Sequence, residues 1–506
     1  MNIRKKLHRW LVQTLPLAAL GAFTLLISGC GPDEWIVWAP DGTHGVINGS
    51  QRIDPAGNLL GEITAEKEHV VAWLPDSRRV LVVRRVPAQD WSEYAALLGE
   101  ERALAVAQAG AEMARLIREY QGALDAFDES AAFKIWKENL DAHSVGVETV
   151  MYCLKVTRPG LLDPMLDAVA KKQNAQEKED PVVDTDKTVE TGAHLLEQIG
   201  VPDIHELHLR SAVVSGDSGD QMLFRSADGF ASVAVSPNSR AVAFVRQEGS
   251  HEEGSDSGLY VMALEAGAQA VLVAKGAEFA AWSPDGQELA YTKSEVRRAS
   301  KNGFILGAIA HRRVCATDGS IIAEPEAGED VAGLVLPEYP ARLAWLSDGR
   351  ILFAGAKFSL PATTQNLPER LTLFALRLNP EASMEQLIPE SVPARLTQRV
   401  NYFTVSPDGK NVAVLGKAGA VSVLTLATKN FATFQDSIPQ FEKKNDDDSI
   451  LVPAWRTADE LTWLVPAGDR AGSSHRGEVV IASLSGGRRA ISKSWPDSAS
   501  LPPLEK

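Results

Sequence analysis

One short phrase recurs seven times along this chain, and it constrains the fold more than any other feature. Each copy is an apolar segment, a tight turn of Pro-Asp-Gly type and a second apolar segment. Proline presets φ at the second turn position, and Asp and Gly suit the third and fourth positions, which together predict a type I turn. The first segment of each copy ends at Trp38, Trp73, Val235, Trp282, Trp345, Val405 or Trp455. The phrase therefore predicts a series of β-hairpins.

The spacing of the copies predicts how the hairpins assemble. Successive turns are 35 to 63 residues apart, except for one step of 162 residues between Pro75 and Pro237. Steps of this size with about four strands each are typical of propeller blades. We therefore predict an all-β fold, a β-propeller of about seven blades, with six or eight as alternatives. The five repeated tryptophans are then expected to pack between blades rather than to form an aromatic platform for a cofactor.

The long step holds an insertion with a different periodicity. Apolar residues recur at spacings of three and four, as expected for one face of a helix, at Met113, Ile117, Tyr120, Leu124 and Phe127. Further helices are predicted over 131–140, 145–155, 162–171 and 194–199, with Ser92 and Ser130 as N-caps and a charged linker over 171–192. Two interpretations remain open: a helical cap packed on one propeller face, or a partner-binding module or lid over the central channel.

The N-terminus has the pattern of a secretion signal. Four basic residues in the first nine precede an apolar stretch from Trp10 to Ile27, which ends in Ser28-Gly29-Cys30. This pattern resembles the bacterial lipoprotein signal, which implies cleavage after Gly29 and lipid attachment at Cys30. The alternative is a membrane-spanning anchor, since the apolar stretch approaches the required length. Gly31 after the cysteine favours the outer membrane if the organism has one.

The chain is thus expected to divide into five parts. They are the signal peptide (1–29), the N-terminal blades (30–87), the α-helical insertion with its linker (88–204), the remaining blades (205–498) and a C-terminal tail (499–506).

The repeat itself resembles a known family. The turn Trp282-Ser283-Pro284-Asp285-Gly286 with the following Leu289-Ala290-Tyr291, and the strand Val242-Ala243-Phe244, look like the repeat of TolB-type propellers. Similar phrases occur in the propeller of prolyl-oligopeptidase-like enzymes. The resemblance covers roughly 34–87 and 205–498. It departs from TolB because the first phrase follows Cys30 closely, so we expect no preceding α/β domain, and TolB's partners are not carried over.

The sequence segments that resemble catalytic motifs do not meet the requirements of those motifs. Gly216-Asp217-Ser218-Gly219-Asp220 resembles the nucleophile turn of chymotrypsin-like proteases, but the repeat pattern contradicts the two barrels that such a protease needs, so we predict a polar hairpin loop. The sequence contains no Gly-x-Ser-x-Gly elbow, and we expect no C-terminal hydrolase domain of the prolyl-oligopeptidase kind. We therefore predict no catalytic residues.

Metal sites are not indicated either. His205 and His208 are three residues apart in an expected strand, and would point to opposite faces. The acidic segments 251–253 and 446–448 lack the spacing of a calcium loop and are read as solvated surface, with loose cation binding as the alternative. We expect no metal and no cofactor. Cys153 and Cys315 either pair in an oxidising envelope or remain two buried thiols.

These observations lead to a function hypothesis. The net charge of −15 argues against nucleic-acid binding. We expect a lipid-anchored protein of the bacterial cell envelope, facing the periplasm or the surface, that binds a protein, peptidoglycan or another glycan without catalysis. The alternative is a hydrolase or lyase with its site at the central channel. A third hypothesis is that the protein is a sensor or a secretion accessory whose insertion binds a partner. The ligand-binding residues are not identifiable from the sequence.

Overall fold

A computed structural model describes most of the repeat region and part of the insertion. The described ranges, some with gaps of one or two residues, are 36–119, 134, 145–170, 199–212, 219–247, 258–297, 304–314, 321–323, 334–335, 342–355, 372–378, 383–416, 419–435, 452–466 and 477–493. The signal segment with Gly29 and Cys30 lies outside them, as do Cys315, the acidic segments 251–253 and 446–448, and most of the motif 216–220.

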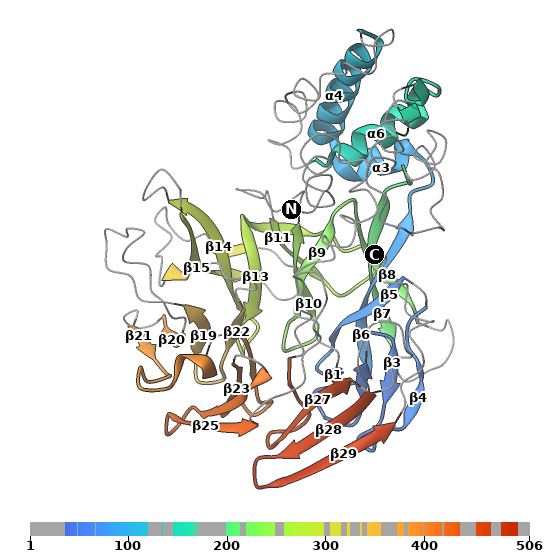
Figure 1. Ribbon diagram of the computed structural model, residues 1–506. Coiled ribbons are helices and arrows are strands. Elements are labelled where there is room, and N and C mark those ends of the chain that lie inside the picture. Colours follow the sequence, from blue (N-terminus) through green and yellow to red (C-terminus); the bar gives the residue numbers. More distant parts are fainter. Residues whose placement is uncertain are drawn as a thin grey trace, which may run out of the picture.

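The described strands form seven antiparallel sheets arranged around a ring (Figure 1). The first sheet contains β1 (Ile36–Trp38), β2 (Gly45–Ile47), β3 (Gln51–Ile53) and β4 (Leu59–Glu62). The second contains β5 (Glu68–Trp73), β6 (Arg79–Pro87), β7 (Asp203–Ser211) and β8 (Gln221–Ser226). The third contains β9 (Gly229–Val235), β10 (Ala241–Gln247), β11 (Gly258–Ala263) and β12 (Val271–Lys275).

The remaining four sheets repeat this order. The fourth contains β13 (Ala277–Trp282), β14 (Glu288–Arg297), β15 (Phe304–Val314), β16 (Ile321–Ala323) and the added β17 (Leu334–Val335). The fifth contains β18 (Leu343–Trp345), β19 (Arg350–Gly355), β20 (Thr372–Arg377) and β21 (Ser383–Gln386). The sixth contains β22 (Arg399–Val405), β23 (Asn411–Leu415), β24 (Val421–Thr425) and β25 (Asn430–Gln435), preceded by the short helix η3 (Ala394–Leu396). The seventh contains β26 (Ala454–Trp455), β27 (Glu460–Pro466), β28 (Gly477–Ser483) and β29 (Gly487–Lys493).

Hydrophobic contacts between neighbouring sheets hold the ring together. Each of seven buried clusters combines residues of two adjacent sheets, and one of them joins Ile36 and Trp38 of the first sheet to Val479 and Ile481 of the seventh. The first strand of each sheet lies innermost, since contacts between adjacent sheets run mainly through these strands. The sheets are therefore propeller blades in a closed ring, and the predicted β-propeller is confirmed.

The repeated tryptophans lie at the blade interfaces, and three of the five make the same hydrogen bond. The indole Nε1 donates to a backbone oxygen of the preceding blade, one residue before the equivalent position: Trp73 to Val37 (3.1 Å), Trp282 to Ala234 (2.9 Å) and Trp455 to Thr404 (3.1 Å). At the junction of the last and first blades, Trp38 Nε1 instead donates to Thr462 Oγ1 (2.8 Å), which donates to the Ala454 carbonyl oxygen (3.0 Å). The indole ring therefore fills the apolar interface between two blades, while its N–H forms a hydrogen bond to the neighbouring blade.

The turn chemistry explains why the phrase repeats. In the copy after β13, Ser283 Oγ donates to Asp285 Oδ1 (2.6 Å) and accepts from the backbone N–H of Glu288 (2.9 Å). The fourth turn position has positive φ, which is +68° at Gly286 but +57° where serine replaces glycine at Ser239. Glycine adopts this conformation without the steric cost that a side chain carries.

The described helices lie together at one side of the ring, between β6 and β7 (Figure 1). They are α3 (Trp91–Leu98), α4 (Glu100–Glu119) and α6 (Val147–Thr157). The N-cap of α3 is Asp90, whose carboxylate accepts from the Glu93 backbone N–H (2.9 Å). The prediction of Ser92 as N-cap is wrong because Asp90 already fills that position, and Ser92 lies within the helix. Ser130, the linker 171–192 and nearly all of 131–140 lie outside the described residues.

Candidate functional site

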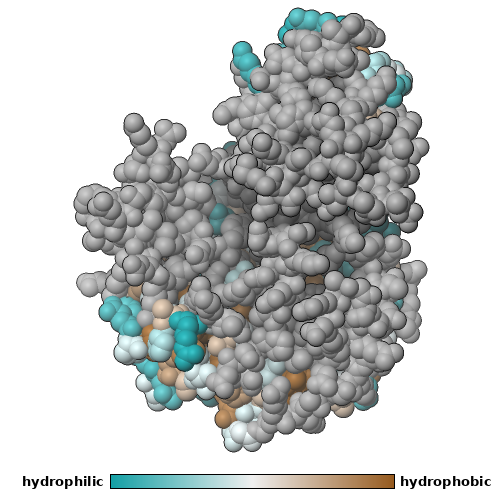
Figure 2. All heavy atoms as spheres, viewed as in Figure 1, coloured by the Kyte–Doolittle hydropathy of each residue, from teal (hydrophilic) through white to brown (hydrophobic). Residues whose placement is uncertain are grey.

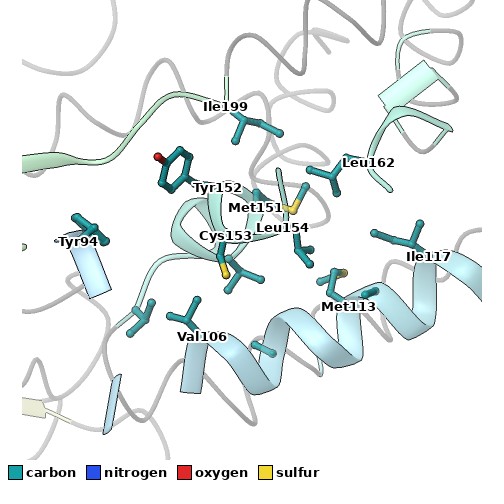
Figure 3. Packing of buried hydrophobic residues seen from close by; sticks show 14 of the residues in the cluster. Tyr94, Val106, Met113, Ile117, Met151, Tyr152, Cys153, Leu154, Leu162 and Ile199 are labelled. Carbon is teal, nitrogen blue, oxygen red and sulfur yellow. The ribbon is translucent and has the colours of Figure 1, made fainter. Parts of the chain in front are cut away.

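The second blade carries the insertion, and its core packs directly against the blade. A buried cluster joins Val106, Met113 and Ile117 of α4 to Tyr152 and Leu154 of α6 (Figure 3). The same cluster includes residues at the blade's edge: Ala88, Ile199, Ile204 and Ala227. The insertion is therefore a small helical core that shares apolar surface with the propeller.

Chain entry and exit of the insertion lie next to each other. Strand β6 pairs with β7 as far as Pro87 and Asp203, and the Ala88 N–H donates to the Pro202 carbonyl oxygen at 3.1 Å. The insertion thus takes the place of a hairpin turn between the second and third strands of the blade. The expected insertion end at 204 lies two residues inside β7.

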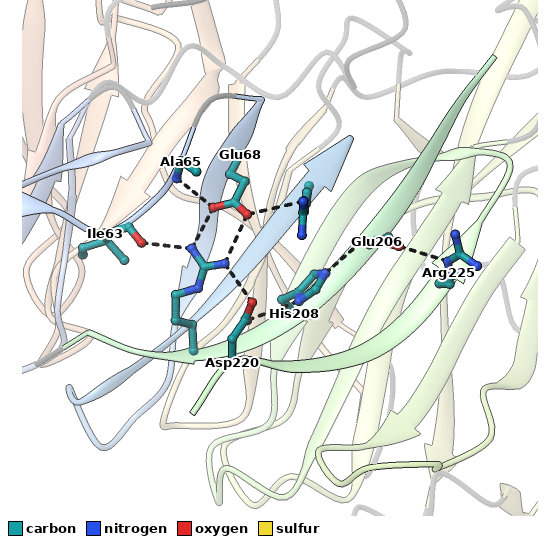
Figure 4. Close-up of polar contacts among 9 residues, drawn as sticks. Ile63, Ala65, Glu68, Glu206, His208, Asp220 and Arg225 are labelled. Carbon is teal, nitrogen blue, oxygen red and sulfur yellow. Dashed lines mark hydrogen bonds and ion pairs between the residues drawn. The ribbon is translucent and has the colours of Figure 1, made fainter. Parts of the chain in front are cut away.

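A continuous chain of charged and polar contacts crosses one face of the second blade (Figure 4). It begins on helix α3, where Glu93 accepts from Arg225 on β8 (2.8 Å). Arg225 also donates to Glu206 (3.0 Å), and Glu206 contacts the ring of His208 (3.1 Å). The other ring nitrogen of His208 lies 3.2 Å from Asp220.

The chain continues to the first blade through Arg210. This guanidinium donates to Asp220 (3.0 Å), to Glu68 (2.7 Å) and to the backbone oxygen of Ile63 in the first blade (3.0 Å). Burial opposes ionisation of Glu68, but the hydrogen bonds from Arg210 and Ala65 lower its pKa overall. The contacts therefore link the insertion, the second blade and the first blade through hydrogen bonds and ion pairs of their side chains.

A second ionic link joins helix α4 to the third blade. Arg102 makes two hydrogen bonds to the Asp228 carboxylate, both 2.8 Å long, and Arg246 on β10 lies 3.4 Å from the same carboxylate. The Asp228 side chain is 5% exposed and that of Arg102 is 12% exposed. Bidentate pairing of this kind fixes orientation as well as distance. It therefore holds α4 over the junction of the second and third blades.

The opposite face of the second blade carries a different set of side chains. His69 on β5, Arg85 on β6 and His205 on β7 share this face, because Arg85 pairs with His205, and His69 pairs with Val83 two residues before Arg85. The His205 ring meets the edge of Phe230 in the third blade, with centroids 6.5 Å apart. This group is half-exposed or exposed at the end of the blade that bears the insertion.

The structure separates the two histidines that the sequence places three residues apart. His205 faces the third blade, whereas His208 faces the ionic chain on the other side of the sheet, as the strand periodicity predicts. No group of three or more potential metal ligands occurs among the residues the structure describes. Asp220, the last residue of the protease-like motif, pairs with Arg210 and His208. Cys153 is a free, buried thiol in α6, and burial raises its pKa.

The charged residues of this blade carry no sequence motif. Glu93 and Arg102 lie on helices of the insertion, and their partners Arg225 and Asp228 follow 132 and 126 residues later in the chain. Alternation along β5, β6 and β7 could have placed the side chains on faces, once the pairing of β6 with β7 across the insertion was known.

The fold and this blade define the class: a β-propeller with a helical insertion in its second blade. Solved structures of similar fold include TolB from Acinetobacter baumannii, at 16% identity and a TM-score of 0.31, over 58% of this chain and 61% of that one. They also include a puromycin-hydrolyzing peptidase of Mycobacterium tuberculosis, at 15% identity and a TM-score of 0.37, over 60% of this chain and 45% of the peptidase.

These likenesses concern the propeller architecture. The chain spans less than two thirds of the length of either structure. No protein-family model matches the chain, and no curated protein matches it. Within the described part of the chain, no helix has both the length and the apolar character needed to cross a bilayer.

Proposed function

We propose that this chain is a lipid-anchored β-propeller of the bacterial cell envelope that binds a protein or glycan partner through one propeller face and its helical insertion. In this proposal the chain catalyses no reaction. A binding role needs a rigid scaffold and an accessible module, and both are present in the described residues.

One observation carries the non-catalytic part of the proposal. The half-exposed side chains of the innermost strands are mainly small or aliphatic, among them Val37, Val71, Ala72, Ala231, Val233, Ala234, Ala281, Ala344 and Ala454. The half-exposed carboxylates described on these strands are Glu68, which pairs with Arg210, and Glu278. Glycoside hydrolysis and general acid–base chemistry need converging carboxylates or histidines around the bond that breaks. Inner strands of this composition favour a scaffold over a channel enzyme.

The insertion offers the accessible module. Its helix α4 buries an apolar stripe and turns charged residues outward, and Figure 2 shows hydrophilic side chains on this part of the surface. Because the ionic contacts of Glu93 and Arg102 fix the helices on the blades, a partner would meet a preformed surface. Preorganisation of this kind lowers the entropic cost of binding.

The anchor is tested by cell fractionation. Replacing Cys30 by serine removes the thiol that would carry the lipid, and the protein is expected to leave the membrane fraction. Continued membrane association of Cys30→Ser after a high-salt wash would contradict the lipid anchor.

The partner is tested by affinity capture from envelope extracts. The full chain is compared with a variant in which residues 89–201 are replaced by Asn-Gly, a two-residue turn that suits the adjacent ends at Ala88 and Pro202. The variant's unfolding curve controls for folding. A protein or glycan captured by the full chain and lost by the folded variant supports the proposal. Equal capture by both proteins would contradict a role for the insertion, and substrate turnover would favour the hydrolase or lyase.

A further inference from the structure

Three basic side chains gather on the face of the second blade that meets the third blade. Arg85 lies directly opposite His205 in the β6–β7 register, and His69 is its diagonal neighbour across β5–β6. Directly opposed side chains in a sheet have Cβ atoms about 5 Å apart, and diagonal neighbours lie roughly 7–8 Å apart. One small group could therefore contact all three side chains.

Arg85 makes no salt bridge within the described residues, and Asp203 is its diagonal neighbour in the β6–β7 register. No carboxylate of that part of the chain lies within ion-pair distance of its guanidinium, which is half-exposed. Its neighbour Arg84 points to the other face and pairs with Glu68 at 3.7 Å. Of the two acids that act on His205, Asp228 already pairs with Arg102 and Arg246.

The two histidines are held in their uncharged forms at neutral pH. Burial and the charge of Arg85 lower the pKa values of both His69 and His205 to about 4. The His69 side chain is reachable from solvent. At neutral pH each imidazole is uncharged and offers one N–H donor, while the guanidinium of Arg85 offers up to five.

We propose that His69, Arg85 and His205 form an anion-binding site that takes a carboxylate or phosphate group of the partner. Arg85 supplies the charge and a planar fork of donors that matches either group, and the two imidazoles donate from either side. Asp203, two residues from His205 on the same face, opposes the anion and limits its affinity. This inference specifies which chemical group of the partner would bind at the propeller face, and to that extent it rests on the proposed function.

The site is tested on the full chain, solubilised in detergent, with inorganic phosphate and acetate as separate probes. The imidazole resonances of His69 and His205 are followed by NMR during each titration. Saturable shifts of both rings are expected, and the probe that binds more tightly tells a phosphoryl from a carboxylate ligand. Unchanged resonances with both probes at 50 mM, a concentration of order ten times a weak millimolar Kd, would overturn the proposal without any substitution.

Three variants test which residues form the site. Arg85→Gln is expected to weaken binding at least tenfold, whereas Arg84→Gln, with the same charge change on the opposite face, should alter it less than twofold. Asp203→Asn is expected to strengthen binding severalfold. Equal losses in Arg84→Gln and Arg85→Gln would mean a diffuse charge effect and overturn the site. Because the probes are free anions, failure to capture a partner would refute the binding function and leave this result standing.

Discussion

Thr462 holds the junction between the last and first blades, and its hydroxyl can be tested almost in isolation. This residue is fully buried, accepts a hydrogen bond from Trp38 Nε1 (2.8 Å) and donates to the Ala454 carbonyl oxygen (3.0 Å). Thr462→Val keeps the shape of the side chain and removes both hydrogen bonds. We expect this variant to destabilise the propeller.

The size of the effect follows from the burial of the two groups that lose their partner. Each buried donor or acceptor left unsatisfied costs about 1–3 kcal/mol. The methyl group that replaces the hydroxyl returns roughly 1 kcal/mol of apolar burial. For two such groups, the free energy of unfolding should therefore fall by about 1–5 kcal/mol.

The assay is urea-induced unfolding followed by circular dichroism. Thr462→Ser is the matched control, because it keeps the hydroxyl and loses one buried methyl, at a cost of about 1 kcal/mol. A double-mutant cycle with Trp38→Phe should give a coupling of at least 0.5 kcal/mol. If Thr462→Val is no less stable than Thr462→Ser, the hydroxyl does not support the ring in the way argued above.

Three further predictions concern a turn, the insertion and pH. Ser239→Gly relieves a φ of +57° and should stabilise the chain by roughly 0.5–1 kcal/mol in the same urea assay; a loss of stability would contradict the strain. Asp228→Asn removes the charge that Arg102 and Arg246 contact, so limited proteolysis should cut the insertion at least tenfold faster; unchanged cleavage would show that the ionic link does not hold α4. His69 and His205 have pKa values of about 4 when folded and near 6.5 when unfolded, so the unfolded chain binds more protons between these values and stability should fall as pH drops from 6.5 to 4. The double variant His69→Gln/His205→Gln should flatten that part of a melting-temperature profile, and an unaltered slope would contradict the assignment.

The sequence was sufficient to predict the propeller because its determinants are local and repeated. A turn such as Ser283–Gly286 contains its own hydrogen bonds, and a tryptophan at the same place in five copies indicates an interface without knowledge of the partner. The helix over 145–155 was also predicted close to its observed bounds of Val147–Thr157.

The ionic contacts of the second blade could not be predicted in the same way. Arg225 lies 132 residues from Glu93, and Arg210 lies 142 residues from Glu68, so no local pattern relates them. Their pairing depends on the register of β6 with β7, and these two strands are separated in the sequence by the insertion. The N-cap at Asp90 was missed for a local reason, since Asp90 and Ser92 are both good caps and stand two residues apart.

The closure of the ring has a mechanical consequence. The first and seventh blades are each built from one continuous stretch of chain, and in the described residues they meet through side chains rather than through a shared strand. This boundary therefore resembles the other blade boundaries in being held by side-chain packing, and differs in that Trp38 donates to a side chain rather than to a backbone oxygen. Tension on the N-terminus would act first on β1, and so on both boundaries of the first blade: the Trp38–Thr462 contact with the seventh blade and the Trp73–Val37 contact with the second. The ring should therefore open beside the first blade under force.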